Sequence, residues 1–121
     1  MKQSLRTSGE FQTVYRRGKR FEGLSITAFV LRNSLSYHRF GITVSRKALG
    51  KAVRRNRAKR LLRETFRLTE LSLQGLTEKY DWVLNAKSSF LSSNSNLARA
   101  EFEKLVLDVA NKEVAFESKT S

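Results

Sequence analysis

The sequence predicts a small α+β domain, a sandwich of one sheet and the helices that cover it. The spacing of hydrophobic residues switches between three or four, typical of helices, and two, typical of strands. These segments follow the order helix, strand, strand, helix, strand, helix, with the first strand either continuous or split. The 121 residues include 40% hydrophobic residues, no Cys and no Pro. Residues 1–121 can therefore form one domain around a single core without disulfides, with an ordered core over about 5–113.

The first helix is expected to begin after Thr7. Thr7 and Glu10, three residues apart, match a capping box, in which each side chain accepts from the other residue's backbone N–H. Phe11 and Tyr15 then lie one turn apart on one apolar stripe. Gly18 is a natural end for this helix.

Two strands are expected next, joined as a hairpin by a turn over 33–36. In the first, one face holds Leu24, Ile26, Ala28 and Val30, and the other holds Ser25, Thr27, Phe29 and Leu31. The second spans 39–45, with Phe40, Ile42 and Val44 inward and Arg39, Gly41, Thr43 and Ser45 outward. The mixed outward face, with hydroxyls and an aromatic ring, suits an extended single RNA strand. A half-exposed sheet face without a ligand explains the pattern equally well.

The stretch 46–67 carries ten Lys and Arg among its 22 residues, opposed only by Glu64. On a helix its apolar side would hold Ala58, Leu61, Leu62, Thr65, Phe66 and Thr69, and its polar side Asn56, Lys59, Arg60, Arg63 and Arg67. The first turn, around 51–54, is expected to project beyond the edge of the core. Like charges at this density repel one another, and a polyanion relieves that repulsion. We therefore expect a basic amphipathic helix that binds nucleic acid rather than a merely solvated one.

A third strand is expected over 80–87, with Trp82 in the core, and then a polar loop over 88–96. The last helix should pack through Ala98, Phe102, Leu105, Val106 and Val109, with Glu101 and Glu103 on its outer face. A strand–helix–strand crossover between parallel strands is normally right-handed. Residues 114–121 are expected to form a fraying C-terminal tail.

The net charge of +13 is concentrated in one half of the chain. Residues 1–67 carry 18 Lys and Arg against three Glu, whereas residues 68–121 carry six against eight acids. This asymmetry indicates a binding side for nucleic acid, with an anionic membrane as the weaker alternative. The sequence has no signal-peptide core and no apolar run that could cross a bilayer, so a soluble cytoplasmic protein is expected.

A catalytic site within the polypeptide is not expected. The only His is His38, at the entry to a strand, and the only Asp residues, Asp81 and Asp108, have no acidic neighbour at metal-ligand spacing. A glycine-rich phosphate loop and a nucleophile with its base are also missing. We expect no metal site and no catalytic residues in the protein alone.

The stretch ALGKAVRRNRAKRLLRETFR resembles the bacterial ribonuclease P protein component. The hallmark of that family, Arg-Asn-Arg followed by Lys-Arg and a further Arg, is matched by Arg55–Arg57, Lys59–Arg60 and Arg63. The segments EFQTVY, FGITVSRK and DWVLNAK resemble the family's first helix, the strand before its basic helix and its last strand. The match covers most of residues 5–110. Tyr15 stands where Phe is common, and either ring can stack on a base.

The resemblance implies an RNA-binding protein that assists a catalytic RNA in removing the 5′ leader of precursor tRNA. It implies contact with the catalytic RNA through Arg54, Arg55, Asn56, Arg57, Lys59, Arg60, Arg63 and Arg67. It implies a leader-binding cleft at Phe11, Tyr15, Thr27, Phe29, Thr43, Arg46 and Lys47. Mg²⁺ is expected in the RNA-containing holoenzyme and no cofactor in the protein alone, which should be monomeric. The family also implies a mostly antiparallel sheet with an uncommon left-handed crossover.

Two other classes of function remain open from the sequence. A general RNA-binding or ribosome-associated protein would need the basic helix but not the cleft, so its RNA binding would be indifferent to a 5′ leader. A self-sufficient nuclease would cut RNA without an RNA subunit and would lose activity on mutation of a carboxylate.

Overall fold

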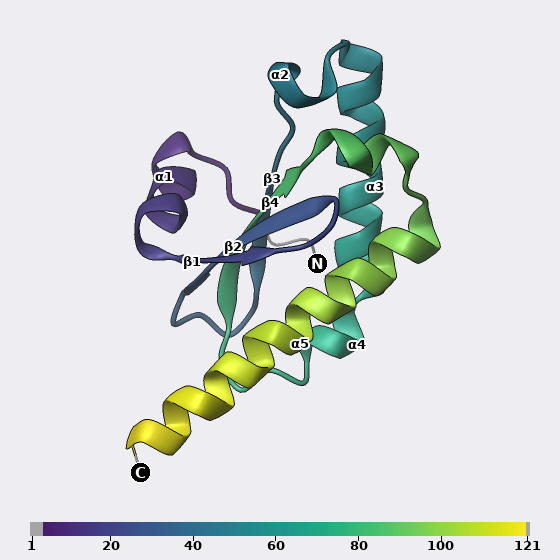
Figure 1. Cartoon of the computed structure of the whole chain (residues 1–121). Coiled ribbons are helices and arrows are strands. Elements are labelled where there is room, and N and C mark those ends of the chain that lie inside the picture. Colours follow the sequence, from purple (N-terminus) through teal and green to yellow (C-terminus); the bar gives the residue numbers. More distant parts are fainter. Residues whose placement is uncertain (1–3, 121) are drawn as a thin grey trace.

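One sheet separates α1 on one face from α3 and α5 on the other (Figure 1). The computed structural model describes residues 4–120, with side chains as far as residue 113. The elements are α1 (Ser8–Arg17), β1 (Lys19–Glu22), β2 (Ile26–Arg32), β3 (Arg39–Thr43), α2 (Arg46–Leu49), α3 (Ala52–Leu68), α4 (Glu70–Leu73), β4 (Tyr80–Ala86), the 3₁₀ helix η1 (Ser88–Ser92) and α5 (Ser95–Thr120). The predicted α+β sandwich is confirmed, and so is its mostly antiparallel sheet.

The strand order in the sheet is β1-β2-β4-β3. β2 pairs antiparallel with β1 and with β4, whereas β3 pairs with β4 in parallel. The predicted hairpin between the first two predicted strands, which correspond to β2 and β3, is therefore wrong, because β4 lies between them. β4 is buried on both faces, with Trp82, Val83 and Leu84 all fully buried, and a strand of this kind belongs in the middle of a sheet. The chain from β3 to β4 makes the expected crossover through α2, α3 and α4; its left-handedness stays a prediction.

The first predicted strand, over 24–31, begins at Ile26 as β2, and a turn at residues 23–25 joins it to an additional strand, β1, which precedes the predicted range. Leu24 was expected inward but lies in this turn and is 89% exposed. Glu101 of α5 holds the turn between β1 and β2. Its carboxylate accepts from the backbone N–H groups of Ser25 (2.9 Å) and Ile26 (2.7 Å) and from the Ser25 hydroxyl. The expectation that Glu101 lies on the outer face of the last helix is therefore wrong.

Two hydrophobic clusters lie on the two faces of the sheet. The larger one joins β2, β4, α3 and α5 around Trp82 and Phe102, and it includes the predicted core stripe of the last helix. The smaller one lies under α1, around Leu5, Val14 and Val83. The predicted polar loop after β4 contains η1, whose Phe90 is buried in the larger cluster.

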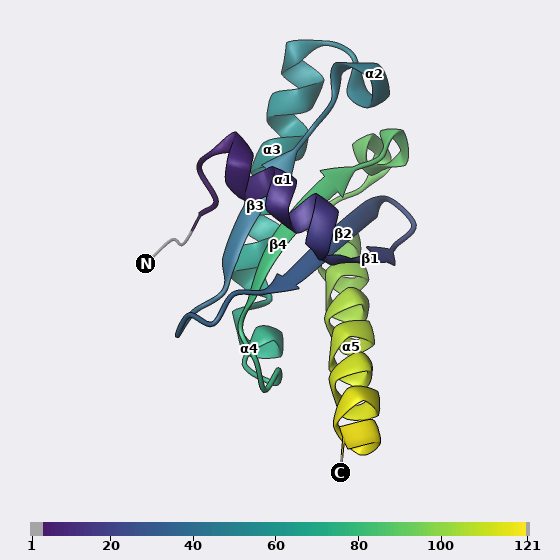
Figure 2. The same ribbon diagram turned by 90° about the vertical axis from the view of Figure 1, so that its left-hand side faces the viewer.

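Helix α5 is longer than predicted. Its backbone is helical as far as Thr120, so the expected tail over 114–121 is helical over 114–120, and Ser121 lies outside the described residues. Figure 2 shows its C-terminal half extending past the sheet. Glu113 ties the helix to the start of β4, because its carboxylate accepts from the N–H groups of Thr77 and Glu78 and from the Tyr80 hydroxyl.

His38 is a structural residue at the entry to β3 rather than a surface residue. Its Nδ1 accepts from the backbone N–H of Tyr80 (3.0 Å) and from the indole N–H of Trp82 (3.2 Å). Both bonds require an unprotonated Nδ1. Burial, and then the positive charge of Lys79, lower the pKa of His38 below its ordinary value of 6.5.

The free energy of unfolding should fall as the pH drops below about 6.5. Because the folded-state pKa of His38 is lowered, the unfolded chain binds a proton first, so stability is complete above the unfolded pKa and declines toward the folded one. Urea unfolding at pH 7.5 and 5.0 measures this. His38→Gln, which offers an amide oxygen that does not titrate, should show a smaller difference between the two pH values. An equal difference in both proteins would contradict the assignment.

Candidate nucleic-acid interface

Helix α3 presents a basic row to solvent and packs its other side into the core. Ala58, Leu62 and Thr65 are buried, and Leu61 and Phe66 pack beside them. This is the apolar side predicted from the sequence. The exposed residues are Arg54, Asn56, Arg57, Arg60, Arg63 and Arg67, while Arg55 and Lys59 are half-buried.

The row keeps its positive charge. Within the described part of the chain, no carboxylate forms an ion pair with a Lys or Arg of residues 46–67. The only acid in that stretch, Glu64, accepts a hydrogen bond from the Ser95 hydroxyl instead. Charges that are not paired internally remain available to an external polyanion.

The start of α3 projects beyond the sheet together with α2, as predicted (Figure 1). Ser45 caps α2 by accepting from the Ala48 N–H at 3.0 Å. Gly50 then turns the chain with a φ of 78°, a conformation that favours glycine. Arg46 and Lys47 are exposed on α2, beyond the end of β3.

A second surface lies where α1 crosses the sheet. Phe11 packs on β3 at Gly41, where a Cβ atom would overlap the Phe11 ring. Tyr15, which is 37% exposed, meets Phe29 edge-on with 4.8 Å between ring centroids. Its hydroxyl donates to Asn85 Oδ1 (3.0 Å) and lies 3.2 Å from the Thr43 hydroxyl. The structure thus brings Phe11, Tyr15, Phe29 and Thr43 together.

Thr27 does not join this open surface. It is 6% exposed, and its hydroxyl lies 3.4 Å from the Glu22 carboxylate on the neighbouring strand. Two residues that the sequence reading missed do join it. Asn85 bonds to Tyr15, and the Arg20 guanidinium lies 5.9 Å from the centroid of the Phe29 ring. Asn85 could have been found from the sequence, because it alternates with the inward Trp82, Leu84 and Ala86 along its strand. The position of Arg20 could not, because it depends on the unpredicted strand β1.

Arg39 forms structural ion pairs on the α1 side of the sheet. Its Nε and Nη2 donate to the buried Asp81 carboxylate at 2.8 and 2.7 Å, and its Nη1 donates to Glu10 at 3.0 Å. Glu10 completes the predicted capping box with Thr7. The backbone N–H groups of Arg6 and Thr7, together with Arg39, hold the pKa of Glu10 below its ordinary value. The Asp81 pair, in turn, raises the pKa of Arg39.

The described side chains do not assemble a metal centre. Over that part of the chain, no three His, Asp or Glu residues gather closely enough to hold an ion. Among the same residues, none of the helices combines the length and the apolar character needed to cross a lipid bilayer.

Comparisons with known proteins all identify the same family. The model of the family described as Ribonuclease P matches residues 1–110. The ribonuclease P protein component of Fusobacterium nucleatum is 38% identical over 101 residues, 84% of this chain and 87% of that protein. The RNase P protein structure from Thermotoga maritima matches with a TM-score of 0.74 and 27% identity, covering 87% of this chain and 96% of that one. The structure from Staphylococcus aureus gives 0.73 and 25%, covering 91% and 96%.

Gly41→Ala should separate α1 from the sheet, because the new Cβ would overlap the Phe11 ring. Overpacking of this kind typically costs about 1–3 kcal/mol, measurable by chemical denaturation. Gly9→Ala is the matched control, since nothing lies closer than 3.9 Å to a Cβ at that helical position. The control should be neutral or stabilising. Equal stability of the two variants would refute the close packing of Phe11 on β3.

Proposed function

The chain belongs to the ribonuclease P protein family, and from this premise we propose that it binds the catalytic RNA of ribonuclease P and the 5′ leader of precursor tRNA. Ribonuclease P is an endoribonuclease of tRNA processing, and this chain is its protein component. The observation that carries the RNA-binding proposal is the basic row of α3, which has no internal ion pairs within the described residues.

The row would bind the catalytic RNA by replacing its counterions. Each phosphate neutralised by Lys or Arg releases condensed cations, which contributes close to one unit to the dependence of log affinity on log salt. The docked apolar side of α3 keeps the helix rigid, so little ordering of the backbone opposes binding. Arg57, Arg60 and Arg63 are exposed on the opposite, basic side of the helix and would contact phosphates first.

The surface at α1 would hold the leader as a single strand. Its rings, Phe11, Tyr15 and Phe29, offer faces and edges on which unpaired bases can stack. The Tyr15 hydroxyl is already bonded to Asn85, so the ring orientation is fixed before RNA arrives. Arg46 and Lys47, exposed beyond the end of β3, would contact phosphates of the same strand.

The protein would place and screen the two RNAs while the catalytic RNA performs the cleavage. Because the described side chains do not gather ligands for a metal ion, we assign the Mg²⁺ of the holoenzyme to the RNA. The protein itself is proposed to act as a monomer. The rival class of a general RNA-binding protein is less well supported, because the aromatic surface at α1 would then have no role.

Arg57→Ala should weaken binding of the catalytic RNA and lower the salt slope by about one unit. The holoenzyme should also need more Mg²⁺ to cut precursor tRNA, because one screening charge is lost. Arg99→Ala on α5 removes the same charge away from the row and should leave the slope unchanged. Filter binding at several salt concentrations measures both. A salt-independent affinity of the unmodified protein would falsify the electrostatic mechanism.

Tyr15→Ala should lower the affinity of the holoenzyme for precursor tRNA by about 1–3 kcal/mol, the usual contribution of one stacked base. Its affinity for mature tRNA, which has no leader, should not change. Tyr15→Phe keeps the ring and loses only the bonds to Thr43 and Asn85, so it should stay close to the unmodified protein. An equal loss for both tRNAs would show that the surface at α1 does not bind the leader.

A further inference from the structure

A concave site lies on the face of the sheet opposite α1. It is a cavity of about 460 Å³ between the β2–β3 loop, the C-terminal half of α3 and α4. Phe40 and Phe66 line it, stacked on each other with 4.4 Å between ring centroids, and Tyr37 adds a ring that is 39% exposed. The volume falls within the range of about 300–1,000 Å³ that is common for small-ligand sites.

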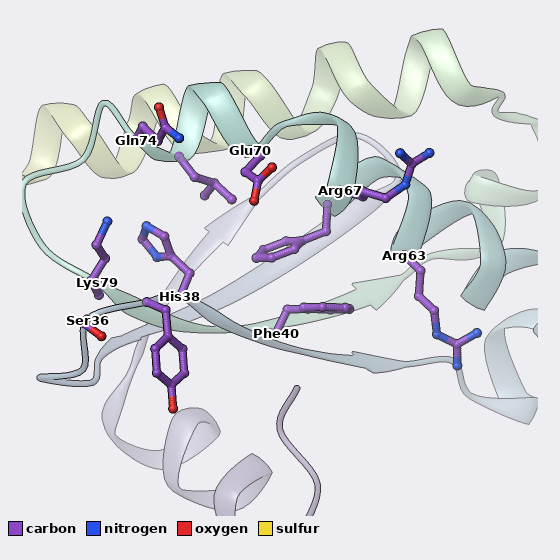
Figure 3. A pocket seen from close by; sticks show the side chains of 11 residues that line it. Ser36, His38, Phe40, Arg63, Arg67, Glu70, Gln74 and Lys79 are labelled. Atoms are coloured by element: carbon purple, nitrogen blue, oxygen red, sulfur yellow. The ribbon is translucent and has the colours of Figure 1, made fainter. Parts of the chain in front are cut away.

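The charged groups of this pocket are ordered along it. Figure 3 shows Arg63 and Arg67 at one end, His38 and Lys79 at the other, and Glu70 between them with its carboxylate directed into the pocket. Arg63 and Arg67 have no ion-pair partner among the described residues. A ligand that fits must therefore carry an anionic group at one end and an aromatic body with hydrogen-bond donors in the middle.

We propose that this pocket binds one unpaired nucleotide of an RNA strand, with guanine as the preferred base. The phosphate would lie at Arg63 and Arg67, and the base would enter beside the aromatic rings. This inference rests on the proposed function, because Arg63 and Arg67 belong both to the basic row of α3 and to the lining of the pocket. An RNA strand that follows the row passes the mouth of the pocket, where a base can turn in.

Stacking provides a surface for any base. Phe66 is held between Phe40 and Phe102, at 4.4 and 5.7 Å, so the floor of the pocket is rigid. Tyr37 makes no side-chain hydrogen bond within the described residues and is free to cover an inserted base. Base–aromatic stacking typically changes affinity by about 5- to 150-fold per base on alanine substitution.

Glu70 provides the preference for guanine. An ionised carboxylate only accepts hydrogen bonds and can take two at once. Guanine presents two adjacent donors, N1–H and the N2 amino group, on one edge, whereas uracil presents one N–H between two carbonyl oxygens. Glu70 is the only carboxylate in the lining, so the discrimination is assigned to it.

The single histidine of the chain is a built-in reporter, because His38 lines the pocket. Its imidazole Hε1 proton gives one NMR signal that a stacked base would move. The experiment titrates the full-length protein at pH 7.5 with the 5′-monophosphates of guanosine, adenosine, cytidine and uridine, and with inorganic phosphate. Guanosine monophosphate should give a saturable shift at the lowest concentration. Inorganic phosphate should need at least about ten times more, since it lacks the stacking contribution.

Three variants and a matched control complete the test. Tyr37→Ala should weaken guanosine monophosphate binding about tenfold, and Tyr37→Phe should retain it. Glu70→Gln should remove the advantage of guanosine over adenosine. Leu35→Ala, in the same loop and 37% exposed but outside the lining, should behave as the unmodified protein.

The proposal is overturned if inorganic phosphate reproduces the guanosine titration, if no nucleotide moves the His38 signal, or if the four nucleotides bind equally. It is also overturned if Leu35→Ala weakens binding as much as Tyr37→Ala. These failures differ from a failure of the proposed function. Tyr37→Ala should keep the salt slope of catalytic-RNA binding, whereas Arg57→Ala, in the α3 row but outside the pocket lining, should lower that slope and leave the preference for guanosine monophosphate unchanged.

Discussion

The cations on the exposed side of α3 have no carboxylate partner within the described residues, and the rest of the structure depends on this. Ten Lys and Arg lie in residues 46–67, and the fold pairs none of them with a carboxylate within the described residues. Their mutual repulsion lowers the free energy of unfolding, and the burial of Ala58, Leu62 and Thr65 has to offset this loss. A polyanion that removes the repulsion gains affinity from it, so the same charges that strain the free protein favour the complex.

Four of the acidic residues instead connect one element of the fold to another through hydrogen bonds and ion pairs. Glu10 and Asp81 hold Arg39 and thereby join α1 to β3 and β4. Glu101 joins α5 to the β1–β2 turn, and Glu113 joins it to the start of β4. Each of these carboxylates accepts at least two hydrogen bonds in the interior or at its edge, where such bonds are stronger than at an exposed surface. The negative charge therefore stabilises the frame, and the positive charge remains on the binding surfaces.

Local features of the chain were predictable from the sequence, and pairings between distant segments were not. The capping box at Thr7 and the two sides of α3 follow from spacing alone, because neighbours on a helix are neighbours in sequence. The strand order could not be read in this way, since a turn over 33–36 suits a hairpin as well as the observed loop. In the candidate site, the basic row followed from charge. The ion pair of Arg39, predicted only to point outward, depends on Asp81, 42 residues away, and could not be predicted. Thr27 was misjudged for the same reason, because Glu22 covers it from a strand that the sequence did not predict.

The central position of β4 also limits the order in which the protein can fold. β4 inserts between β2 and β3, two strands that precede it in the chain, so the sheet cannot close until residue 86 is available. During synthesis from the N-terminus, the cationic half of the chain therefore leaves the ribosome before its core can form. Closure then requires pairings across a long loop, which places this small domain among slower-folding topologies. In that interval the cationic half of the chain lies beside ribosomal RNA without its completed core.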